Sequence, residues 1–436
     1  MALCGSGSGV QLFWNRCARK SAIIETGTGD TFLKSGFVAI LGRPNVGKST
    51  LLNALTGEKV SIVTAKPQTT RNRIIGVVEA PAHKGTRPAA QIVFVDTPGV
   101  HKPASQLDRR MLQEIHEALE SRDLVLVLVD ATRRVQLEAA RAAKLEIVDE
   151  LGTVLSGVPE SGPGAPPFVA DAEPLAETPG ASIPATEISE SVETPAPEAQ
   201  KSKAPNWNSE DEFLFGLIRN LDCPVFLVLT KIDLVRKDEL LPLIDTLTRQ
   251  FKFAQVIPVS ARKRDGLNVL VDKIVEVLPQ GERFYPKDQY TDQPLRFMVA
   301  ELIRESILIE TGEEVPYSSA VVIEEFEEPE PRAPAQKGKD VRTPLARIAA
   351  AIYCERDGQK AILIGKGGSK LKEIGTAARK KIESLLGSRV FLQLHVIVEP
   401  GWRESRGFIE RLDWRNQLER LAGDQITEKS NSEEDS

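Results

Sequence analysis

The stretch "ILGRPNVGKSTLLNAL", residues 40–55, places a glycine-rich loop between an apolar run and a helical pattern. Its central part fits G-x-x-x-x-G-K-S/T, the preceding "FVAILG" is typical of a buried strand, and a helical pattern begins at Lys48. Because a loop of this kind binds phosphates when a strand precedes it and a helix follows it, the stretch predicts a nucleotide-binding α/β domain.

The residue types in this loop suit phosphate chemistry. Glycines let backbone N–H groups turn toward a phosphate, and a helix N-terminus adds partial positive charge. The Lys48 ammonium can reach the β and γ phosphates, and the Ser49 hydroxyl can ligate Mg²⁺. A chance glycine-rich loop would lack the flanking strand and helix, so we favour the phosphate-binding interpretation.

Four further apolar segments predict strands, and helical patterns separate most of them. They are "QIVFVDTPG" (91–99), "LVLVLVDAT" (124–132), "CPVFLVLTKID" (223–233) and "AQVIPVSA" (254–261). Alternating strands and helices predict an open α/β sheet with its loops gathered at the carboxyl ends of the strands.

Three short motifs at these strand ends favour guanine over adenine nucleotides. In "DTPG", Asp96 can lie near Mg²⁺ and the Gly99 N–H can approach a γ phosphate. In "TKID", the Asp233 carboxylate can accept from guanine N1–H and its 2-amino group, and the stem of Lys231 can cover the base. The "SA" at 260–261 can donate a backbone N–H to guanine O6. The candidate nucleotide-binding residues are Gly42, Arg43, Pro44, Asn45, Val46, Gly47, Lys48, Ser49, Thr50, Asp96, Thr97, Pro98, Gly99, Val100, Thr230, Lys231, Ile232, Asp233, Ser260 and Ala261.

Length and charge predict further modules. A chain of 436 residues suggests two or three domains, and its net charge of −6 hides a strong local asymmetry. Residues 360–411 hold eleven Lys or Arg against five Glu, whereas residues 157–205 hold eight acidic residues, two lysines and ten prolines. The second composition predicts a disordered loop, since it cannot bury enough apolar surface to offset its ordering entropy.

The remaining composition points to an intracellular protein. The four cysteines form no metal-binding or disulfide pattern, and no apolar run reaches the ~18 residues that span a bilayer. The first 24 residues lack acids and carry Arg16, Arg19 and Lys20, so an organelle transit peptide stays open, although a mobile extension is favoured.

A second domain follows residue 284. "PLRFMVAELIRESILIETG" predicts a helix, "SSAVVIEEFEE" and "RIAAAIYCER" predict strands, and Asp357-Gly358 predicts a turn that ends the second of these. The period of "QKAILIG" leaves strand and short helix open. A helix over residues 369–386 and the strand "RVFLQLHVIVEP" complete this domain.

The loop "GKGG", residues 365–368, is G-x-x-G and lacks the spacing of the upstream loop. Between two helices in a basic module, such a loop clamps a single-stranded nucleic-acid backbone. Lys366 and Lys370 can meet phosphates, while Ile362 and Ile364 can form a floor for bases or, equally well, pack in a core. The candidate RNA-binding residues are Ile364, Gly365, Lys366, Gly367, Gly368 and Lys370.

Several of these motifs resemble those of one GTPase family in their residues and in their order along the chain. "GRPNVGKSTLLNAL", "KPQTTRNRIIGV", "DTPGVHKP", "ILIGKGGSKLKEIG" and "LQLHVIVEPGWRE" are similar to the Era family, and the likeness covers residues 36–132, 207–326 and 341–410. It implies a Ras-like P-loop GTPase sheet followed by an α+β KH domain of the second type, in which "QKAILIG" is a short helix.

The resemblance also implies a catalytic centre. Switch I would fall on residues 66–73, where Thr70, or less favourably Thr69, would close over Mg²⁺ together with Ser49 and Asp96. Lys48, Thr70, Gly99 and Asn45 would be the catalytic residues. Relatives with the P-loop Asn bind K⁺ beside the phosphates, so Asn45 and switch I carbonyls are expected to hold K⁺.

Two positions depart from common GTPase patterns. Thr230 stands where the base-reading motif usually begins with Asn, and a hydroxyl there should weaken guanine affinity at most. Val100 stands where many GTPases use a glutamine that orients the attacking water. A valine side chain forms no hydrogen bond, so slow intrinsic turnover is expected.

The resemblance implies a domain plan and a role. The plan is a disordered extension (1–35), a GTPase domain (36–284) with a disordered insert at about 152–206, a KH domain (290–411) and an acidic tail (415–436). The role would be a monomeric, cytoplasmic GTP switch that binds GTP and GDP. It would also bind the 3′ end of 16S ribosomal RNA in 30S subunit assembly. Family members also contact the inner membrane peripherally, and a basic helix such as "ARKKIESLLGSR" could serve that, although RNA contact or solvation is favoured for it. The alternatives are an RNA-binding protein that hydrolyses GTP poorly, another ribosome-associated or tRNA-modifying GTPase, and a membrane-associated stress GTPase.

Overall fold

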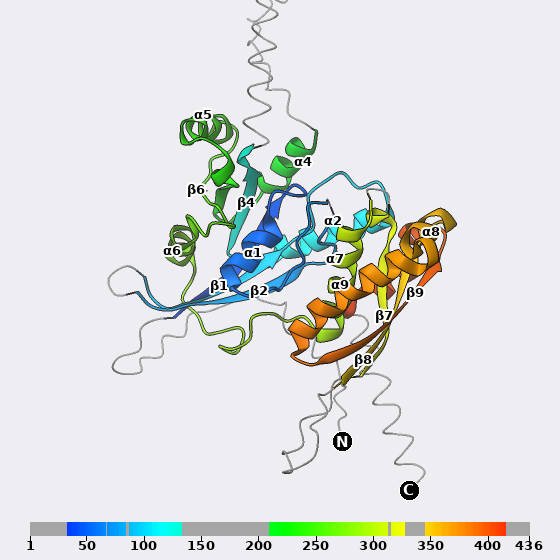
Figure 1. Ribbon diagram of the computed structural model, residues 1–436. Helices are drawn as coiled ribbons and strands as arrows, with labels where there is room; N and C mark the ends of the chain where they lie inside the picture. Colours follow the sequence, from blue (N-terminus) through cyan, green and yellow to red (C-terminus); the bar gives the residue numbers. More distant parts are fainter. Residues whose placement is uncertain are drawn as a thin grey trace, which may run out of the picture. The chain divides into compact units, whose positions relative to one another are not determined.

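The computed structural model describes residues 33–66, 68–83, 87–132, 209–312, 315–327 and 345–415 (Figure 1). They form two β-sheets with their helices, and both sheets belong to one compact unit of the chain. The predicted insert and nearly all of the predicted extension and tail lie outside the described residues, as do residues 133–151, whose sequence favours a helix.

The N-terminal sheet has six strands in the order β2-β3-β1-β4-β5-β6, and all neighbours are parallel except β2 with β3. This confirms the predicted open α/β sheet. The strands are β1 (Lys34–Gly42), β2 (Ile74–Ala80), β3 (Ala90–Asp96), β4 (Leu124–Asp130), β5 (Val225–Thr230) and β6 (Gln255–Pro258). The helices are α1 (Lys48–Thr56), α2 (Gln106–Glu120), α4 (Ser209–Ile218), α5 (Lys237–Thr248) and α6 (Leu267–Val277).

Continuous apolar runs form the central strands. In β1, residues from Val38 to Leu41 are fully buried, and β4 is buried from Leu124 to Val129. A parallel strand that is covered on both faces needs apolar side chains at every position, which explains why these segments show no polar alternation. The buried strands hold the loops at their carboxyl ends in fixed places.

The strand β1 begins at Lys34, inside the segment that was predicted to be a disordered extension. The Lys34 N–H donates to the Ala89 carbonyl (3.0 Å). Its Nζ donates to the Val275 and Glu276 carbonyls at the end of α6 (2.7 and 2.8 Å), where a cation is favourable. These polar contacts leave no apolar signal in the sequence, so the prediction placed the domain start too late.

Sequence analysis missed β2 altogether. Its sequence "IIGVVEA" contains Gly76, a residue that weakens a strand pattern. A Cβ at Gly76 would lie 2.5 Å from Leu52 Cδ1 of α1. The glycine therefore permits close packing of the edge strand on the helix, which a local pattern cannot reveal.

The C-terminal domain has a three-stranded sheet in the order β7-β8-β9, with β7 antiparallel and β9 parallel to β8. Its chain order, helix-strand-strand-helix-helix-strand, confirms the order that the family resemblance implied. The elements are α7 (Leu295–Glu310), β7 (Ala320–Glu327), β8 (Leu345–Cys354), α8 (Asp357–Ile364), α9 (Ser369–Leu386), β9 (Arg389–Val398) and α10 (Arg406–Leu412). Among the described helices, none combines the length and apolar character that crossing a membrane requires.

The predicted turn at Asp357-Gly358 is wrong, because both residues belong to the first turn of α8. The Gln359 side chain accepts from the Glu355 and Arg356 N–H groups (2.9 and 3.2 Å) and closes the helix start. An acid in the first turn of a helix is favourable, and this outweighs the turn preference of Asp-Gly. The segment "QKAILIG" is helical, as the family resemblance implied.

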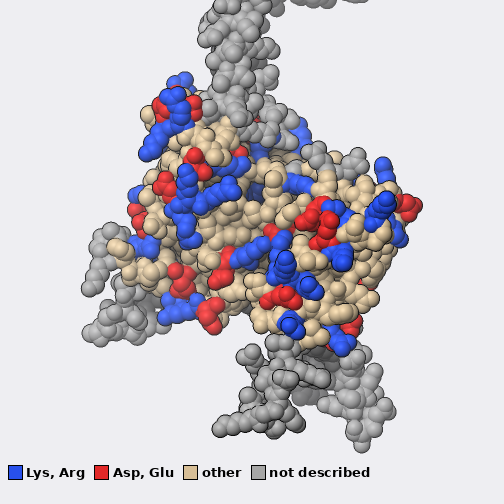
Figure 2. Space-filling view, viewed as in Figure 1, with Lys and Arg blue, Asp and Glu red and all other residues tan. Residues whose placement is uncertain are grey.

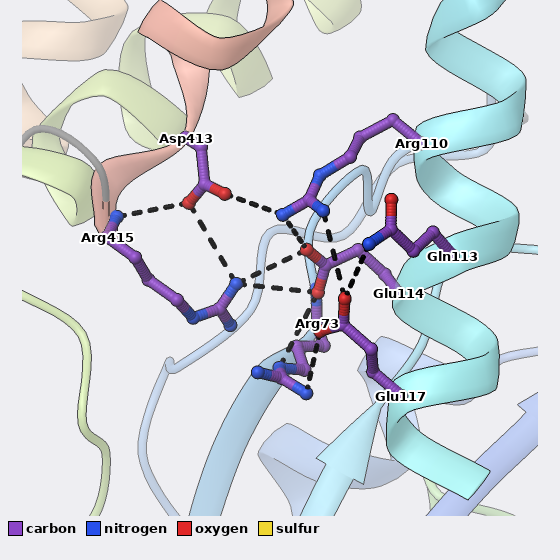
Figure 3. Close-up of polar contacts among 7 residues, drawn as sticks. All are labelled: Arg73, Arg110, Gln113, Glu114, Glu117, Asp413 and Arg415. Atoms are coloured by element: carbon purple, nitrogen blue, oxygen red, sulfur yellow. Dashed lines mark hydrogen bonds and ion pairs between the residues drawn. The ribbon is translucent and has the colours of Figure 1, made fainter. Parts of the chain in front are cut away.

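A charged cluster joins α2 to the end of the C-terminal domain (Figure 3). The fully buried Glu114 carboxylate accepts from Arg110 Nη2 (2.7 Å), Arg415 Nη1 (3.3 Å) and the Arg73 backbone N–H (3.3 Å). Asp413 accepts from Arg110 Nη2 (2.6 Å) and the Arg415 N–H (3.0 Å). Each carboxylate thus faces arginines of other segments, and the cluster fixes how residues 413–415 dock on α2.

We expect Glu114→Gln to lower the free energy of unfolding by about 3–5 kcal/mol, because the buried arginines lose the carboxylate that neutralises their charge. Urea unfolding followed by circular dichroism measures this. Glu117→Gln is the matched control: Glu117 contacts Arg73 in the same cluster (3.2 Å) but is partly exposed, and it should cost less than about 1 kcal/mol. Equal losses in the two variants would contradict a special role for the buried carboxylate.

Candidate nucleotide-binding site and nucleic-acid interface

A cavity of 460 Å³ lies at the carboxyl ends of the parallel strands, within the range of small-molecule sites (roughly 300–1,000 Å³). Its wall comes from the loop after β1, from residues 62–65 and 68–70, and from the ends of β5 and β6. The predicted site residues in its wall are Pro44, Asn45, Gly47, Lys48, Ser49, Thr50, Thr70, Gly99, Thr230, Lys231, Asp233 and Ala261. The other predicted nucleotide-binding residues flank this wall in the same loops: Gly42, Arg43, Val46, Asp96, Thr97, Pro98, Val100, Ile232 and Ser260.

The loop after β1 holds a buried cation. Gly47 has φ 99° and precedes α1, a conformation that glycine adopts without strain. Lys48 Nζ donates to the Gly42 and Arg43 carbonyls (3.1 and 3.0 Å). Burial lowers the pKa of Lys48 to about 8, although the nearby Asp96 carboxylate acts in the opposite direction. The ammonium is thus held inside the loop, where a phosphate can exchange for the two carbonyls.

Three oxygen-bearing side chains meet below this loop. Ser49 Oγ lies 2.7 Å from Asp96 Oδ2 and 2.9 Å from Thr70 Oγ1. Within the described residues, Asp96 Oδ1 is buried without a hydrogen-bond partner, and burial raises the pKa of this carboxyl despite the opposing charge of Lys48. A hard cation would relieve both costs, and oxygen ligands are those that Mg²⁺ prefers.

The structure also separates the two candidate threonines of switch I. Thr70 points at Ser49, whereas Thr69 Oγ1 donates to the Lys66 carbonyl (2.7 Å). Asn45 Nδ2 donates to the Ala65 carbonyl (2.7 Å), so the P-loop asparagine contacts the backbone one residue before switch I. Asn45 is one of the groups that the sequence analysis expected to hold K⁺, and its contact lies next to the expected switch I carbonyls.

Gly99 lies against the P-loop. A Cβ there would come within 2.7 Å of Pro44 Cγ and 2.9 Å of Pro44 Cα, so a glycine is required for this approach. Val100 is fully buried, and its N–H donates to the Gly42 carbonyl (3.0 Å). Its side chain is therefore neither polar nor exposed to a water beside a bound phosphate.

The base-reading end is organised by short polar contacts. The Thr230 hydroxyl donates to the Val46 carbonyl (2.6 Å), so the threonine that replaces the usual asparagine still ties β5 to the P-loop. Ser260 Oγ donates to Asp233 Oδ1 (2.6 Å), and this hydrogen bond lowers the pKa of the carboxyl and keeps it an acceptor. The Ser260 N–H donates to the Asp265 carbonyl (3.0 Å), which leaves the Ala261 N–H as the candidate donor to guanine O6.

Sequence reasoning missed two residues that support this site. Asp130 Oδ2 accepts from Lys231 Nζ (2.6 Å), which orients the lysine stem over the cavity. Asn53 Oδ1 accepts from the Val60 and Ser61 N–H groups (3.0 and 2.9 Å) and anchors the segment that leads into switch I. Asp130 ends an apolar run at a strand terminus, and this position was a usable signal. Asn53 sits within a helix and gave none.

The segment around switch I packs on α7 of the C-terminal domain. Glu305 Oε1 accepts from the Val63 N–H (3.1 Å), and its Oε2 contacts Lys59 (2.7 Å) and Lys381 of α9 (2.9 Å). Lys66 Nζ donates to carbonyls at the end of α7, including that of Gly312 (3.1 Å). A single carboxylate therefore links the base of switch I to both helices.

The second glycine-rich loop connects α8 to α9. Gly365, Gly367 and Gly368 have φ values of 72°, 61° and 79°, so each needs the freedom of glycine. Lys366 is exposed, and Lys370 Nζ pairs with Glu373 (2.6 Å).

Basic side chains continue along α9 beyond this loop. Figure 2 shows them on the surface that carries α9, with acidic ones between. Ile362 is 44% exposed, whereas Ile364 packs against the core of the domain. The base-floor interpretation therefore suits Ile362 better than Ile364, which was the predicted contact residue.

Two family models match the chain, one described as 50S ribosome-binding GTPase over residues 37–155 and one as KH domain over residues 314–403. GTPase Era of Ruminiclostridium cellulolyticum is 34% identical over 382 residues, which are 88% of this chain and 98% of the relative. GTPase Era of Syntrophus aciditrophicus is 38% identical over 85% of this chain and 91% of the relative. The chain belongs to the Era family of GTPases.

Solved Era structures share this architecture. Era in complex with MgGDPNP and nucleotides 1506–1542 of 16S ribosomal RNA superposes with a TM-score of 0.64 at 32% identity, covering 88% of this chain and 99% of that one. An Aquifex aeolicus Era variant bound to GDP and aluminium fluoride gives 0.63 at 32% identity, with 87% and 99% coverage. As an Era family member, this chain hydrolyses GTP to GDP and phosphate and carries a KH domain.

We expect Asp233→Asn to weaken GTP binding by about 3 kcal/mol, roughly 100-fold, because two hydrogen bonds to a charged acceptor are lost. The asparagine amide can instead donate to the 2-oxo group of xanthine, so affinity for xanthosine triphosphate should rise. Fluorescent-nucleotide titration measures both affinities.

Asp238→Asn is the matched control, since Asp238 is exposed and pairs with Arg236 (2.6 Å) outside the cavity wall. It should bind both nucleotides as the wild type does. An unchanged GTP preference in Asp233→Asn would remove Asp233 from base recognition.

Proposed function

We propose that this chain is a GTP-hydrolysing switch that binds the 3′ end of 16S ribosomal RNA through its KH domain and assists assembly of the 30S subunit. The observation that carries the proposal is the pairing of a complete P-loop site with a G-x-x-G loop in one Era family chain. Its support comes from the solved Era complex with MgGDPNP and 16S nucleotides, which matches this chain over both domains.

In this proposal the P-loop residues 42–50 hold the phosphates, with Lys48 on the β and γ phosphates. Asp233, Lys231, Thr230 and the 260–261 pair hold the guanine. Ser49, Thr70 and Asp96 hold Mg²⁺, which is supported by Asp96 Oδ1, an oxygen buried without a hydrogen-bond partner among the described residues. When bound, Mg²⁺ supplies charge neutralisation at the phosphate oxygens. The Gly99 N–H meets the γ phosphate at its close approach to Pro44.

We propose further that K⁺ assists turnover from a place between Asn45 and the switch I carbonyls. Two facts support this: Asn45 contacts the Ala65 carbonyl, directly before switch I (2.7 Å), and the Val100 side chain offers no hydrogen bond to an attacking water. A cation beside the developing phosphate charge would act as a stand-in for an arginine finger.

On the RNA side, Gly365, Lys366, Gly367, Gly368 and Lys370 clamp the RNA backbone. Ile364 supports the loop from the core side and Ile362 faces the bases. We assign α9 to RNA rather than to a lipid surface, since its basic residues follow the loop directly. The protein then works in the cytoplasm, where ribosomal subunits assemble, as a monomer.

Nucleotide state is proposed to gate RNA binding through Glu305. This carboxylate contacts the segment that leads into switch I at the Val63 N–H and α9 at Lys381, and α9 begins at the RNA-clamping loop. GTP orders switch I, so it changes the contacts that Glu305 makes and thereby the place of α9.

We expect a short RNA that copies the 3′ end of 16S ribosomal RNA to raise the single-turnover rate of GTP hydrolysis in KCl, because it favours the nucleotide state in which switch I is ordered. The same RNA should bind the GDPNP form roughly 5- to 150-fold more tightly than the GDP form. Scrambled RNA should do neither, and the double variant Lys366→Asp with Gly367→Asp should lose the stimulation.

Equal RNA affinity in the two nucleotide states would contradict the gating. A turnover rate that the RNA leaves unchanged would show that GTP hydrolysis is not coupled to RNA binding. A double variant that retains the biological function and binds anionic vesicles would favour the membrane-associated alternative.

Replacing KCl by NaCl at equal ionic strength should lower turnover by roughly 100- to 1,000-fold, as expected for one lost charge-stabilising contact. Asn45→Ala should turn over slowly in both salts. Equal rates of the wild type in KCl and NaCl would rule out the K⁺ site.

A further inference from the structure

We propose that Arg304, in helix α7 of the KH domain, is a positioning residue for GTP hydrolysis in the other domain. It holds the switch I backbone so that Thr70 reaches the metal site. The inference rests on the proposed function in one respect, namely that Thr70 is a ligand of Mg²⁺.

Contacts within helix α7 fix the orientation of the Arg304 guanidinium. Arg304 is 2% exposed, and its Nε and Nη2 donate to the two oxygens of Glu301 (2.8 and 2.6 Å). A planar guanidinium that donates two hydrogen bonds to one carboxylate is held in a single orientation. Nη2 also donates to the carbonyl of Thr69. A rigid donor of the KH domain is thus aimed at the residue before Thr70.

Holding the Thr69 carbonyl restricts the threonine that follows. The carbonyl of Thr69 and the N–H of Thr70 share one planar peptide unit, so fixing the oxygen fixes where Thr70 leaves it. The Thr70 hydroxyl lies 2.9 Å from Ser49 Oγ and 3.4 Å from Asp96 Oδ2. Only one peptide unit therefore separates the Arg304 contact from the metal-binding oxygens.

The residue on the other side of Thr70 is anchored on the same domain. Arg71 Nη1 donates to the Ser319 carbonyl (2.8 Å), and its guanidinium lies 5.6 Å from the ring centre of Trp402. Both neighbours of Thr70 are thus held by the KH domain. Of these anchors, Arg304 acts on the backbone itself, and so it sets the position of Thr70 most directly.

The contact matters in one nucleotide state. A switch I threonine completes the metal site only when a γ phosphate is present, whereas GDP is held by the P-loop and the base-reading residues. Loss of the Arg304 contact should therefore reduce turnover and weaken MgGTP binding while GDP binding stays as it is. A residue that only supports the fold would affect both nucleotides.

The experiment compares Arg304→Gln, Arg304→Lys and Arg296→Gln without RNA, in KCl, over a Mg²⁺ titration. Arg296 is the matched control because it lies on the same helix and donates to the Ile323 and Glu324 carbonyls (2.6 and 3.1 Å), within the KH domain. The readouts are single-turnover rate, affinities for fluorescent GDPNP and GDP, and amide hydrogen exchange of residues 66–73 in the MgGDPNP form.

Arg304→Gln should lower the single-turnover rate about 10- to 100-fold, the usual effect of a misplaced catalytic group. It should also raise the Mg²⁺ concentration needed for half-maximal GDPNP binding and increase exchange at residues 66–73, with GDP affinity unchanged. Arg304→Lys keeps a donor without the fork and should lie between Arg304→Gln and the wild type. Arg296→Gln should match the wild type in all readouts.

Glu301→Gln provides a second variant if Arg304→Gln does not fold. It leaves the arginine in place but loosens its orientation, and it should change the same readouts less. Wild-type turnover in Arg304→Gln, equal losses for GDPNP and GDP, or the same losses in Arg296→Gln would each overturn the inference.

Thr70→Ala separates this inference from the proposed function. An unchanged Mg²⁺ requirement in Thr70→Ala would mean that the metal assignment itself is wrong. If Thr70→Ala shows the loss and Arg304→Gln does not, only the positioning role fails. Because no RNA is present, failure of RNA binding in other experiments leaves the result intact.

Discussion

The carboxylate of Glu305 joins three segments of the two domains at one point. It is buried between the segment that leads into switch I, helix α7 and helix α9. Burial alone would raise its pKa, but hydrogen bonds from Lys381, Lys59 and the Val63 N–H outweigh this and lower it. The group therefore stays ionised at neutral pH, and its charge holds together two helices of one domain and a loop of the other.

The two glycine-rich loops perform different tasks with similar backbone means. In both, glycines with positive φ expose the chain before a helix begins. In the first loop the cation is buried, since Lys48 lies inside the turn and is held by carbonyls. In the second loop the Lys366 side chain is exposed, so it can contact the phosphates of a nucleic acid that lies along the surface. The two loops therefore differ in how deeply the lysine side chain is buried, and not in the number of glycines. This burial distinguishes a loop that binds nucleotide phosphates from one that binds a nucleic-acid backbone.

The sequence predicted the parts of this protein that are governed by local chemistry. The buried strands, the P-loop, helix α9 and the loop that precedes it all carry signals within a few residues. The failures share a cause, because they depend on partners distant in sequence. Strand β2 needs the gap that Gly76 leaves beside α1, and strand β1 starts at a lysine held by the end of α6. Arg304 reads as an ordinary helical residue until its contact with Thr69 is known.

The buried Glu114 cluster has a consequence for how the protein is made. Arg415 lies 301 residues after Glu114, so a ribosome at about 5–20 residues per second adds it roughly 15–60 s later. During that interval α2 has been synthesised but one of its neutralising partners has not. The helix that follows the DTPG motif therefore reaches its final electrostatic environment only after Arg415 has been added. A nascent chain acquires its nucleotide pocket and its finished switch at different times.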